Sequence, residues 1–490
     1  MLFGSTQPGS PFTVGGPGSW FFAGAVGLPV PVDRRFLGIM LVYVGLALLL
    51  GAWVEIVRAV RGHPGPFPPA LVVVPVVWAG PLVLAPPLFS GDVYSYAAQG
   101  QMVTRGISPY RHGPAALGGG PFLRLVDPLW RRSPAPYGPA WERLSGAIVQ
   151  AAHHDVLATL VGFRVVAVVG VTLLAVALPA LARSVGKDPA PAFALGVLNP
   201  LVLVVLVGGA HNDALMLGLL AAGLAVARAR RPGPAPVAGG LVLCALAAEV
   251  KIPALIGAVF IGWWWAGPGQ EAPASVRTRL LRVVVAVGAT GAVMAVIAGL
   301  CDLGWRWTTG LSNPGAVVSW LAPATALGLA LSHAAGALGA GHHQAGWVAG
   351  ARGAGVAGAA LLSVRLLLRS DRDGPLTALG WSLLAFVVLG PVVWPWYETW
   401  GLIFLAVAAT GAVVPVIIIV SAVACVADVP SPRLLITGDP ALVAGAWILV
   451  AGAVGLSLGW RRPGRRRPGR RRPGWPRGDR EGQLVSGPRP

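Results

Sequence analysis

Long apolar runs separated by short polar segments recur along almost the whole chain. Five shorter or interrupted runs lie at 213–227, 236–249, 252–266, 397–410 and 412–426. Eight longer runs can each cross a bilayer as one helix: 36–57, 70–88, 157–181, 192–208, 283–300, 345–364, 375–392 and 441–458. In lipid only helices and closed barrels satisfy every backbone polar group, and continuous Leu, Val and Ala runs do not alternate as barrel strands do. The pattern predicts an all-α polytopic membrane protein with about 13 transmembrane helices.

Composition narrows the class of protein further. Hydrophobic residues make up 55% of the 490 residues, charged residues 11%, and the mean hydropathy is +0.71. These values exclude a water-soluble protein. We predict three parts: an N-terminal segment 1–35, which is interfacial or one extra span, a multi-span domain 36–458, and a disordered tail 459–490.

Arginine and lysine in the short loops predict the orientation. Placing them in the cytoplasm sends these segments outside: 89–155, 209–213, 301–320, 393–400 and 427–440. Segment 320–344 must then be re-entrant or cross twice. The tail holds 11 arginines against two acids, in an RRRPG pattern whose prolines prevent a regular helix. Such a tail contacts anionic lipid more often than nucleic acid, so we expect membrane lipids and no nucleic acid as its partner.

The external segment 89–155 is far longer than a connection between neighbouring helices, and it begins with the stretch FSGDVYSYAAQG. If 92–104 is helical, Asp92, Tyr96 and Gln99 share one face. A carboxylate, a phenol and an amide on one face suit a sugar. Asp92 is equally well placed to cap the helix, and both interpretations stand.

Two further motifs put polar residues where one apolar run gives way to the next. GGAHNDALM contains His211, Asn212 and Asp213, which favour a binding role over a simple cap on the following helix. AAEVKIPALIG contains Lys251, one of two lysines against 35 arginines. A compact ammonium at a membrane boundary suits a phosphate; the alternative is a snorkelling lysine paired with Glu249.

Aromatic residues flank charge at two predicted external positions. PWYETWGL includes Trp396 and Tyr397, and GWRWTTG includes Arg306 between two tryptophans. Either motif fits an interfacial aromatic belt or a platform for a sugar or lipid chain. The three cysteines have no disulfide or metal spacing, and no nucleotide-binding motif appears. We expect no cofactor and leave a divalent metal open.

This inventory fits sugar transfer from a lipid-linked phosphosugar. The phosphate is already a good leaving group that needs a cation, while the acceptor hydroxyl needs one carboxylate as general base. A hydrolysing glycosidase would require a pair of carboxyl groups.

The succession FSGDVYSYAAQG, ISPY, DPLWRRSPAPYGPAW, GGAHNDALM, VKIPALI and PWYETWGL resembles the actinobacterial polyprenol-phosphate-mannose-dependent α-1,6-mannosyltransferases of the membrane glycosyltransferase C (GT-C) class. The resemblance runs from about residue 36 to 458. It implies a GT-C-like fold in the plasma membrane with an outward-facing site, a polyprenyl-phosphate-mannose donor and an acceptor in the α-1,6-mannan chain of lipomannan and lipoarabinomannan. It also implies inversion at the anomeric carbon.

The resemblance implies that Asp92 is the catalytic base. We predict that the substrate-binding residues come from the same motifs: Tyr94, Tyr96, Gln99, Tyr110, Arg111, Asp127, Tyr137, His211, Asn212, Asp213, Lys251, Arg306, Trp396 and Tyr397. The alternatives are a secondary transporter or flippase, whose broken helices would also carry midspan polar residues, and a transferase for another polyprenyl-linked sugar.

Overall fold

The computed structural model describes residues 34–427 except 64, 229–232, 266–273 and 340–342, together with isolated residues between 443 and 455; the side chains of 34–39 are not described. The N-terminal segment, most of the predicted span 441–458 and the arginine-rich tail therefore lie outside the described residues. The described part is all-helical, without a strand among its elements.

The apolar runs became helices close to their predicted bounds. The helices that follow these runs are α2 (Arg34–Gly62), α3 (Ala70–Leu84), α7 (Val156–Ser184), α8 (Pro189–Gly196), the π-helix η2 (Val202–Gly208), α9 (Asp213–Ala227), α10 (Pro234–Val250), α11 (Ile256–Trp264), α12 (Val276–Cys301), α15 (Gln344–Leu368), α17 (Pro375–Val388), α18 (Thr399–Val407) and α19 (Val413–Ala427). The predicted run 192–208 is divided between α8 and η2, because Asn199 and Pro200 interrupt it.

Four described helices are long and apolar enough to cross a membrane: Met40–Gly62 within α2, then α7, α12 and α15. A fifth span results if η2 and α9, which are bent by 117° at their break, count as one. Several further apolar helices have 10–17 residues. This architecture is consistent with a membrane protein, while the number of about 13 spans stays a prediction.

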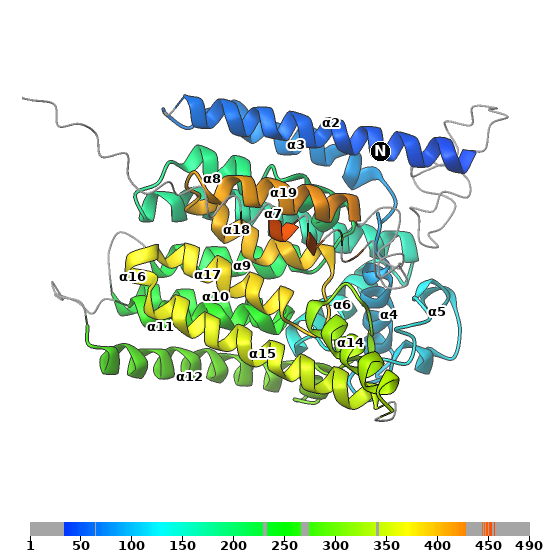
Figure 1. Ribbon diagram of the computed structural model, residues 1–490. Coiled ribbons are helices and arrows are strands. Elements are labelled where there is room, and N and C mark those ends of the chain that lie inside the picture. Colours follow the sequence, from blue (N-terminus) through cyan, green and yellow to red (C-terminus); the bar gives the residue numbers. More distant parts are fainter. Residues whose placement is uncertain are drawn as a thin grey trace, which may run out of the picture.

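Small residues let neighbouring helices approach closely. A side chain at Gly170 of α7 would meet the backbone of Ala214 in α9, and one at Gly223 of α9 would meet the carbonyl of Gly240 in α10. Because lipid supplies no hydrophobic driving force between helices, such close van der Waals contact is one source of their association. In Figure 1 the long helices lie beside one another from α2 at the top to α12 at the bottom.

The predicted external segment 89–155 is folded rather than loose. It forms α4 (Asp92–Thr104), η1 (Pro114–Leu117), α5 (Pro121–Leu125) and α6 (Pro139–Ala151), and α4 packs against α6. With α14 (Pro323–Ala337), these helices gather at the right-hand end of the bundle in Figure 1. In the described part of segment 320–344, α14 precedes the start of α15 and packs as a pair with it. Short helices fill the remaining connections: η3 (Ile252–Leu255), α13 (Trp307–Gly310), η4 (Asn313–Ala316), α16 (Ser370–Asp373) and η5 (Pro395–Glu398).

A buried arginine fixes the backbone where α3 and η2 meet. Arg164 of α7, 2% exposed, donates hydrogen bonds to the carbonyls of Leu82, Val83 and Ala85 and to that of Gly208 at 2.8 Å. These are the carbonyls that helix ends leave without intrahelical partners. Arg164 therefore fixes the two backbone segments that lead into the polar motifs, one just before Asp92 and the other just before His211.

Candidate active site

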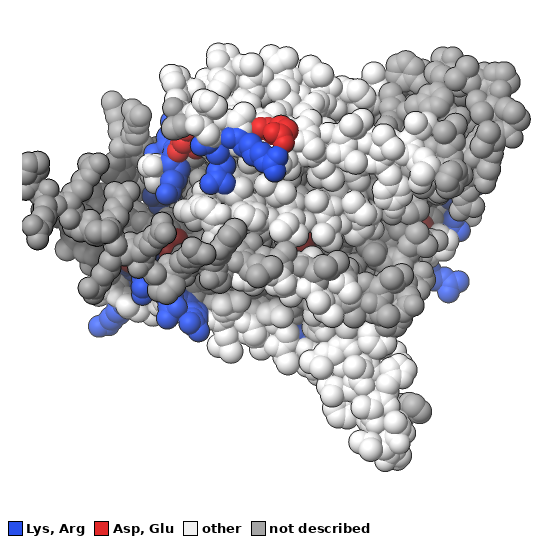
Figure 2. All heavy atoms as spheres, turned by 45° about the horizontal axis from the view of Figure 1, so that its top comes forward, with Lys and Arg blue, Asp and Glu red and all other residues white. Residues whose placement is uncertain are grey.

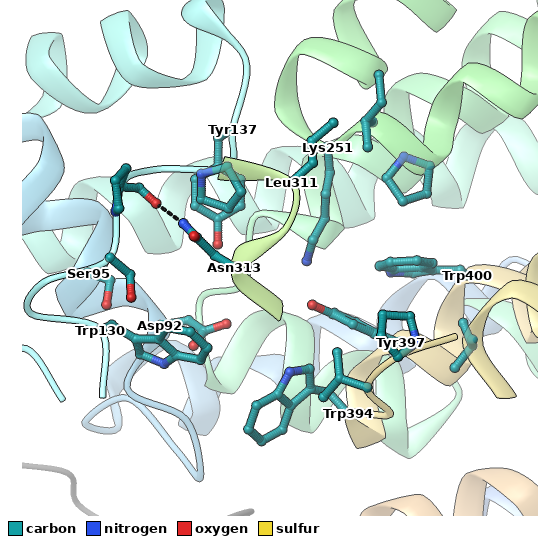
Figure 3. Close-up of a pocket in the computed structure, with 18 of the residues that line it drawn as sticks. Asp92, Ser95, Trp130, Tyr137, Lys251, Leu311, Asn313, Trp394, Tyr397 and Trp400 are labelled. Atoms are coloured by element: carbon teal, nitrogen blue, oxygen red, sulfur yellow. Dashed lines mark hydrogen bonds between the residues drawn. The ribbon is translucent and has the colours of Figure 1, made fainter. Parts of the chain in front are cut away.

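A cavity of about 230 Å³ opens at the end of the bundle that carries α4 and α6. Five separated parts of the chain line it: the start of α4, the segment 130–137, the junction of α10 and η3, the segment 311–313, and the stretch from the end of α17 to α18. Figure 3 shows Asp92 on one side of this space, with Lys251, Tyr397 and Trp400 across it. Three of the segments predicted to be external, 89–155, 301–320 and 393–400, thus converge here.

Asp92 is the first residue of α4, and its carboxylate faces the cavity instead of the helix. Gly91 occupies the N-cap position and no side chain caps the helix, while the Asp92 N–H donates to Ser90 Oγ at 3.2 Å. The Asp92 side chain keeps 22% of its surface exposed. Burial raises the pKa of this carboxyl to about 6, against the opposing effect of the Lys251 charge. The capping interpretation of Asp92 is therefore wrong in this structure.

Lys251 and Asp213 form a buried ion pair at the back of the cavity. Lys251 Nζ lies 3.0 and 2.9 Å from the two carboxylate oxygens of Asp213, whose side chain is fully buried. Trp400 Nε1 donates to Asp213 Oδ1 at 2.6 Å. The same ammonium lies 4.5 Å from the ring centre of Tyr397, within cation–π range. Lys251 is thus held by one carboxylate and still faces the cavity.

Glu249 is not the partner of Lys251, so that alternative is wrong. Its Oε2 instead accepts a hydrogen bond from the Ala140 N–H at 3.1 Å, which satisfies the first turn of α6. Glu249 therefore joins α10 to α6, and Lys251 is left to pair with Asp213.

His211 and Asn212 stand behind Asp92 at the break between η2 and α9. His211 Nδ1 lies 3.6 Å from Asp92 Oδ2 and 3.9 Å from Asp213 Oδ2, and its ring packs on Trp396 with centroids 4.4 Å apart. The Tyr96 hydroxyl donates to Asn212 Oδ1 at 3.1 Å. Neither Asn212 nor Asp213 caps α9 with its side chain. Residues at this break therefore contact both charged groups of the cavity: His211 lies beside Asp92, and Asp213 pairs with Lys251.

The predicted site residues fall into three groups. Some line the cavity, some lie in contact behind it, and some do neither. The lining group is Asp92, Gln99, Tyr137, Lys251 and Tyr397, and the supporting group is Tyr96, His211, Asn212, Asp213 and Trp396. The residues outside both groups are Tyr94 and Tyr110, which are buried elsewhere, Arg111 and Arg306, which are exposed, and Asp127, which accepts the Leu129 N–H.

Sequence reasoning missed several lining residues. Ser95 lies one helical turn after Asp92 at spacing i+3 and could have been found by that rule. Trp130 and Ser133 stand within the motif DPLWRRSPAPY. Asn313, whose Nδ2 donates to the Pro134 carbonyl at 2.5 Å, and Phe386 carry no local signal. Among the described residues, no group of three or more His, Cys, Asp or Glu side chains is arranged to hold a metal ion.

Gly138 sits where α6 meets α10 at very close range, and replacing it tests how tightly the cavity is built. A Cβ at Gly138 would lie 2.5 Å from the carbonyl oxygen and 2.7 Å from the Cα of Glu249. We expect Gly138→Ala to lower stability by about 1–3 kcal/mol, because backbone atoms must move. Thermal unfolding of the purified protein measures this. Gly119→Ala, where nothing lies within 4 Å, is the matched control and should unfold like the wild type; equal midpoints for both variants would contradict the prediction.

The fold and the cavity together are consistent with a helical membrane protein that brings a carboxylate and an ammonium into one cavity. The family model for the α-(1→6)-mannopyranosyltransferase N-terminal domain matches residues 9–267, and the model for the MptB C-terminal domain matches residues 324–459. The chain therefore belongs to the α-(1→6)-mannopyranosyltransferase family, which confirms the resemblance seen in its motifs.

Three related proteins from mycobacteria and a corynebacterium are named as α-(1→6)-mannopyranosyltransferases. An α-(1→6)-mannopyranosyltransferase of Mycobacterium tuberculosis is 34% identical over 68% of this chain and 64% of its own length. The chain thus spans less than two thirds of that relative. A probable α-(1→6)-mannopyranosyltransferase of Mycolicibacterium smegmatis is 33% identical over 78% of this chain and 73% of its own length. α-(1→6)-Mannopyranosyltransferase B of Corynebacterium glutamicum is 33% identical over 67% of this chain and 57% of its own length. No solved structure matches the chain significantly.

Proposed function

We propose that this protein transfers mannose from a polyprenyl-phosphate-mannose donor to a growing α-1,6-mannan chain of lipomannan or lipoarabinomannan on the external side of the plasma membrane. The observation that carries the proposal is that the carboxylate of Asp92 and the ammonium of Lys251 face a single cavity. Family membership supports the sugar and the linkage.

Asp92 acts as the general base in a single displacement. The 6-hydroxyl oxygen of the acceptor mannose attacks C1 of the donor mannose while the bond from C1 to the phosphate oxygen breaks. The hydroxyl proton goes to Asp92, and the bonding electrons leave with polyprenyl phosphate. One base suffices because the leaving group needs no proton. The configuration at C1 inverts, from a β-linked donor to an α-linked product.

Lys251 stabilises the charge that gathers on the departing phosphate. A preorganised cation aimed at developing charge is among the largest contributions a site makes to catalysis. The ion pair with Asp213 holds the Lys251 ammonium, and Trp400 in turn holds Asp213 by a hydrogen bond. The N–H groups of Lys251 that do not contact Asp213 can then donate to a phosphate in the cavity. An ammonium of this kind acts as a point charge and does not require the bidentate geometry of arginine.

The cavity wall is divided in a way that suits two substrates. Ser95, Gln99 and Ser133 bring hydrogen-bonding groups to the side that holds Asp92, which suits the acceptor sugar. Apolar lining residues next to Lys251 and at and after the end of α17 fit the first isoprenyl units of the donor; they are Ile252, Pro253, Phe386, Val387, Pro391 and Val392. Trp394 stacks on Trp396 at 5.0 Å between centroids and extends this apolar lining.

A transporter or flippase is the second candidate, favoured by the broken helix pair η2 and α9 with polar residues at its break. A transferase for another polyprenyl-linked sugar is the third candidate.

One experiment separates these three candidate functions. Membranes containing the protein are given radiolabelled polyprenyl-phosphate mannose and a short α-1,6-mannoside, and elongated product is measured. Product above that of membranes without the protein is expected. Label that crosses sealed vesicles with no product would favour transport, and product from another polyprenyl sugar alone would change the donor.

The rate of transfer should depend on pH through Asp92. The base must be deprotonated, so its active fraction grows as pH rises through its pKa of about 6. We expect kcat/KM to fall about tenfold per pH unit well below pH 6 and to level off above pH 7. The measurement is initial rate against pH with subsaturating acceptor. A rate that stays flat from pH 4.5 to 7.5 would exclude Asp92 as the base.

A further inference from the structure

A second cavity, of about 240 Å³, lies between the end of α2, the start of α8 and the end of α18. It shares no lining residue with the candidate active site. Its floor is apolar and consists of Val60, Pro191, Ala192, Ala406, Val407 and Ala409. Its charged lining residues are Arg61, Lys187 and Asp188.

The two basic side chains of this cavity have no partner within the described part of the chain. Arg61 and Lys187 are both exposed, and neither forms an ion pair or a side-chain hydrogen bond there. The carboxylate of Asp188 is engaged instead as the cap of α8, because its Oδ1 accepts the Ala190 N–H at 2.9 Å. The cavity thus has two cations without an ion-pair partner in the described residues, and one carboxylate that caps α8, beside an apolar floor.

The position of the cavity matches the end of a membrane span. Arg61 stands in the last turn of α2, at the end of the candidate span Met40–Gly62. In Figure 1, α2 ends on the left-hand side of the bundle. Figure 2 shows most of the visible Lys and Arg side chains toward that left-hand end, and the broad surface beside them is almost free of charge. The same end carries the loop arginines that the positive-inside rule assigns to the cytoplasm.

We infer that this cavity binds the head group of an anionic phospholipid, with the phosphate between Arg61 and Lys187 and the glycerol ester region on the apolar floor. Two cations alone would also attract free phosphate. The apolar floor favours an amphiphile, since basic pockets between transmembrane helices bind lipid head groups at this depth. This site is independent of the proposed sugar transfer.

Native mass spectrometry of the full chain in detergent tests the inference. The protein is titrated with phosphatidylglycerol and with phosphatidylcholine of the same acyl chains. We expect phosphatidylglycerol to bind at least ~10-fold more tightly, since each of the two basic residues favours the anionic lipid by about fivefold. Arg61→Gln combined with Lys187→Gln should remove that preference. The control combines Arg183→Gln with Arg365→Gln, two exposed arginines that do not line the cavity, and should keep it.

Three results would overturn the inference. Equal binding of the two lipids by the wild type would mean that no anionic lipid is selected. An equal loss in the control variant would assign the preference to the basic surface as a whole. Displacement of the lipid by millimolar inorganic phosphate, with the same loss in the cavity variant, would make the cavity a site for free phosphate.

Discussion

Replacing Asp92 by Asn should reduce mannose transfer at least ~100-fold, the low end for removal of a general base. Asparagine keeps the shape of the side chain and cannot accept the acceptor proton. Asp92 makes no capping bond in α4, so the change should leave folding intact. The measurement is initial rate in membranes at matched expression, with thermal unfolding of the purified variant as the check on its fold.

Asp127→Asn is the matched control for Asp92. Asp127 belongs to the same segment, but its Oδ1 accepts the Leu129 N–H and its side chain does not line the cavity. The asparagine oxygen can still accept that bond. We expect transfer within about 3-fold of the wild type, well short of the loss that removal of a base causes. If Asp127→Asn abolished transfer and Asp92→Asn did not, the base would be Asp127.

Removing the Lys251 charge should damage both stability and transfer. Lys251→Met leaves Asp213 as an unpaired buried charge, which costs about 3–5 kcal/mol of stability. It also removes the cation proposed to stabilise the leaving phosphate, a loss on the order of 10²–10³ in kcat. Thermal unfolding and initial rates at saturating donor measure the two effects separately.

A double variant separates these two roles of Lys251. In Lys251→Met combined with Asp213→Asn the buried pair is neutral, and the asparagine oxygen still accepts the Trp400 N–H. Stability should return to within about 1 kcal/mol of the wild type, because no unpaired charge is left. Transfer should stay lost. Transfer that recovers together with stability would show that Lys251 has a structural role only.

Hydrophobic patterning was sufficient to predict most of the helices in the described part of the chain. Run 213–227 coincides with α9, and run 157–181 falls within α7. The pattern predicted one helix at 192–208, but Asn199 and Pro200 divide it into α8 and η2, and the hydrophobic pattern does not distinguish the π-helix η2 from an α-helix. Within segment 89–155 only the helix considered at 92–104 was anticipated, and it coincides with α4; the packing of α4 against α6 could not be predicted from the sequence.

The charged residues of the site were the easiest to predict, because charge is rare in this chain. Asp92, Lys251 and Asp213 stood out because ionisable residues beside apolar runs are costly and usually functional. Their pairing could not be read from the sequence: Lys251 has Glu249 two residues away, yet its partner lies 38 positions earlier. Arg306, predicted from the two tryptophans that flank it, and Arg111, predicted from its place beside the ISPY motif, are both exposed outside the cavity. Such distinctions depend on tertiary contacts.

The most direct test of the proposed function is the structure of the product made by the purified, reconstituted wild-type protein. The donor is β-linked polyprenyl-phosphate mannose and the acceptor is an α-1,6-dimannoside, with the new bond examined by NMR. A single displacement assisted by Asp92 predicts a trisaccharide with one new α-1,6 linkage. A β-linked product would contradict the inverting mechanism, and the absence of any product would contradict mannose transfer itself.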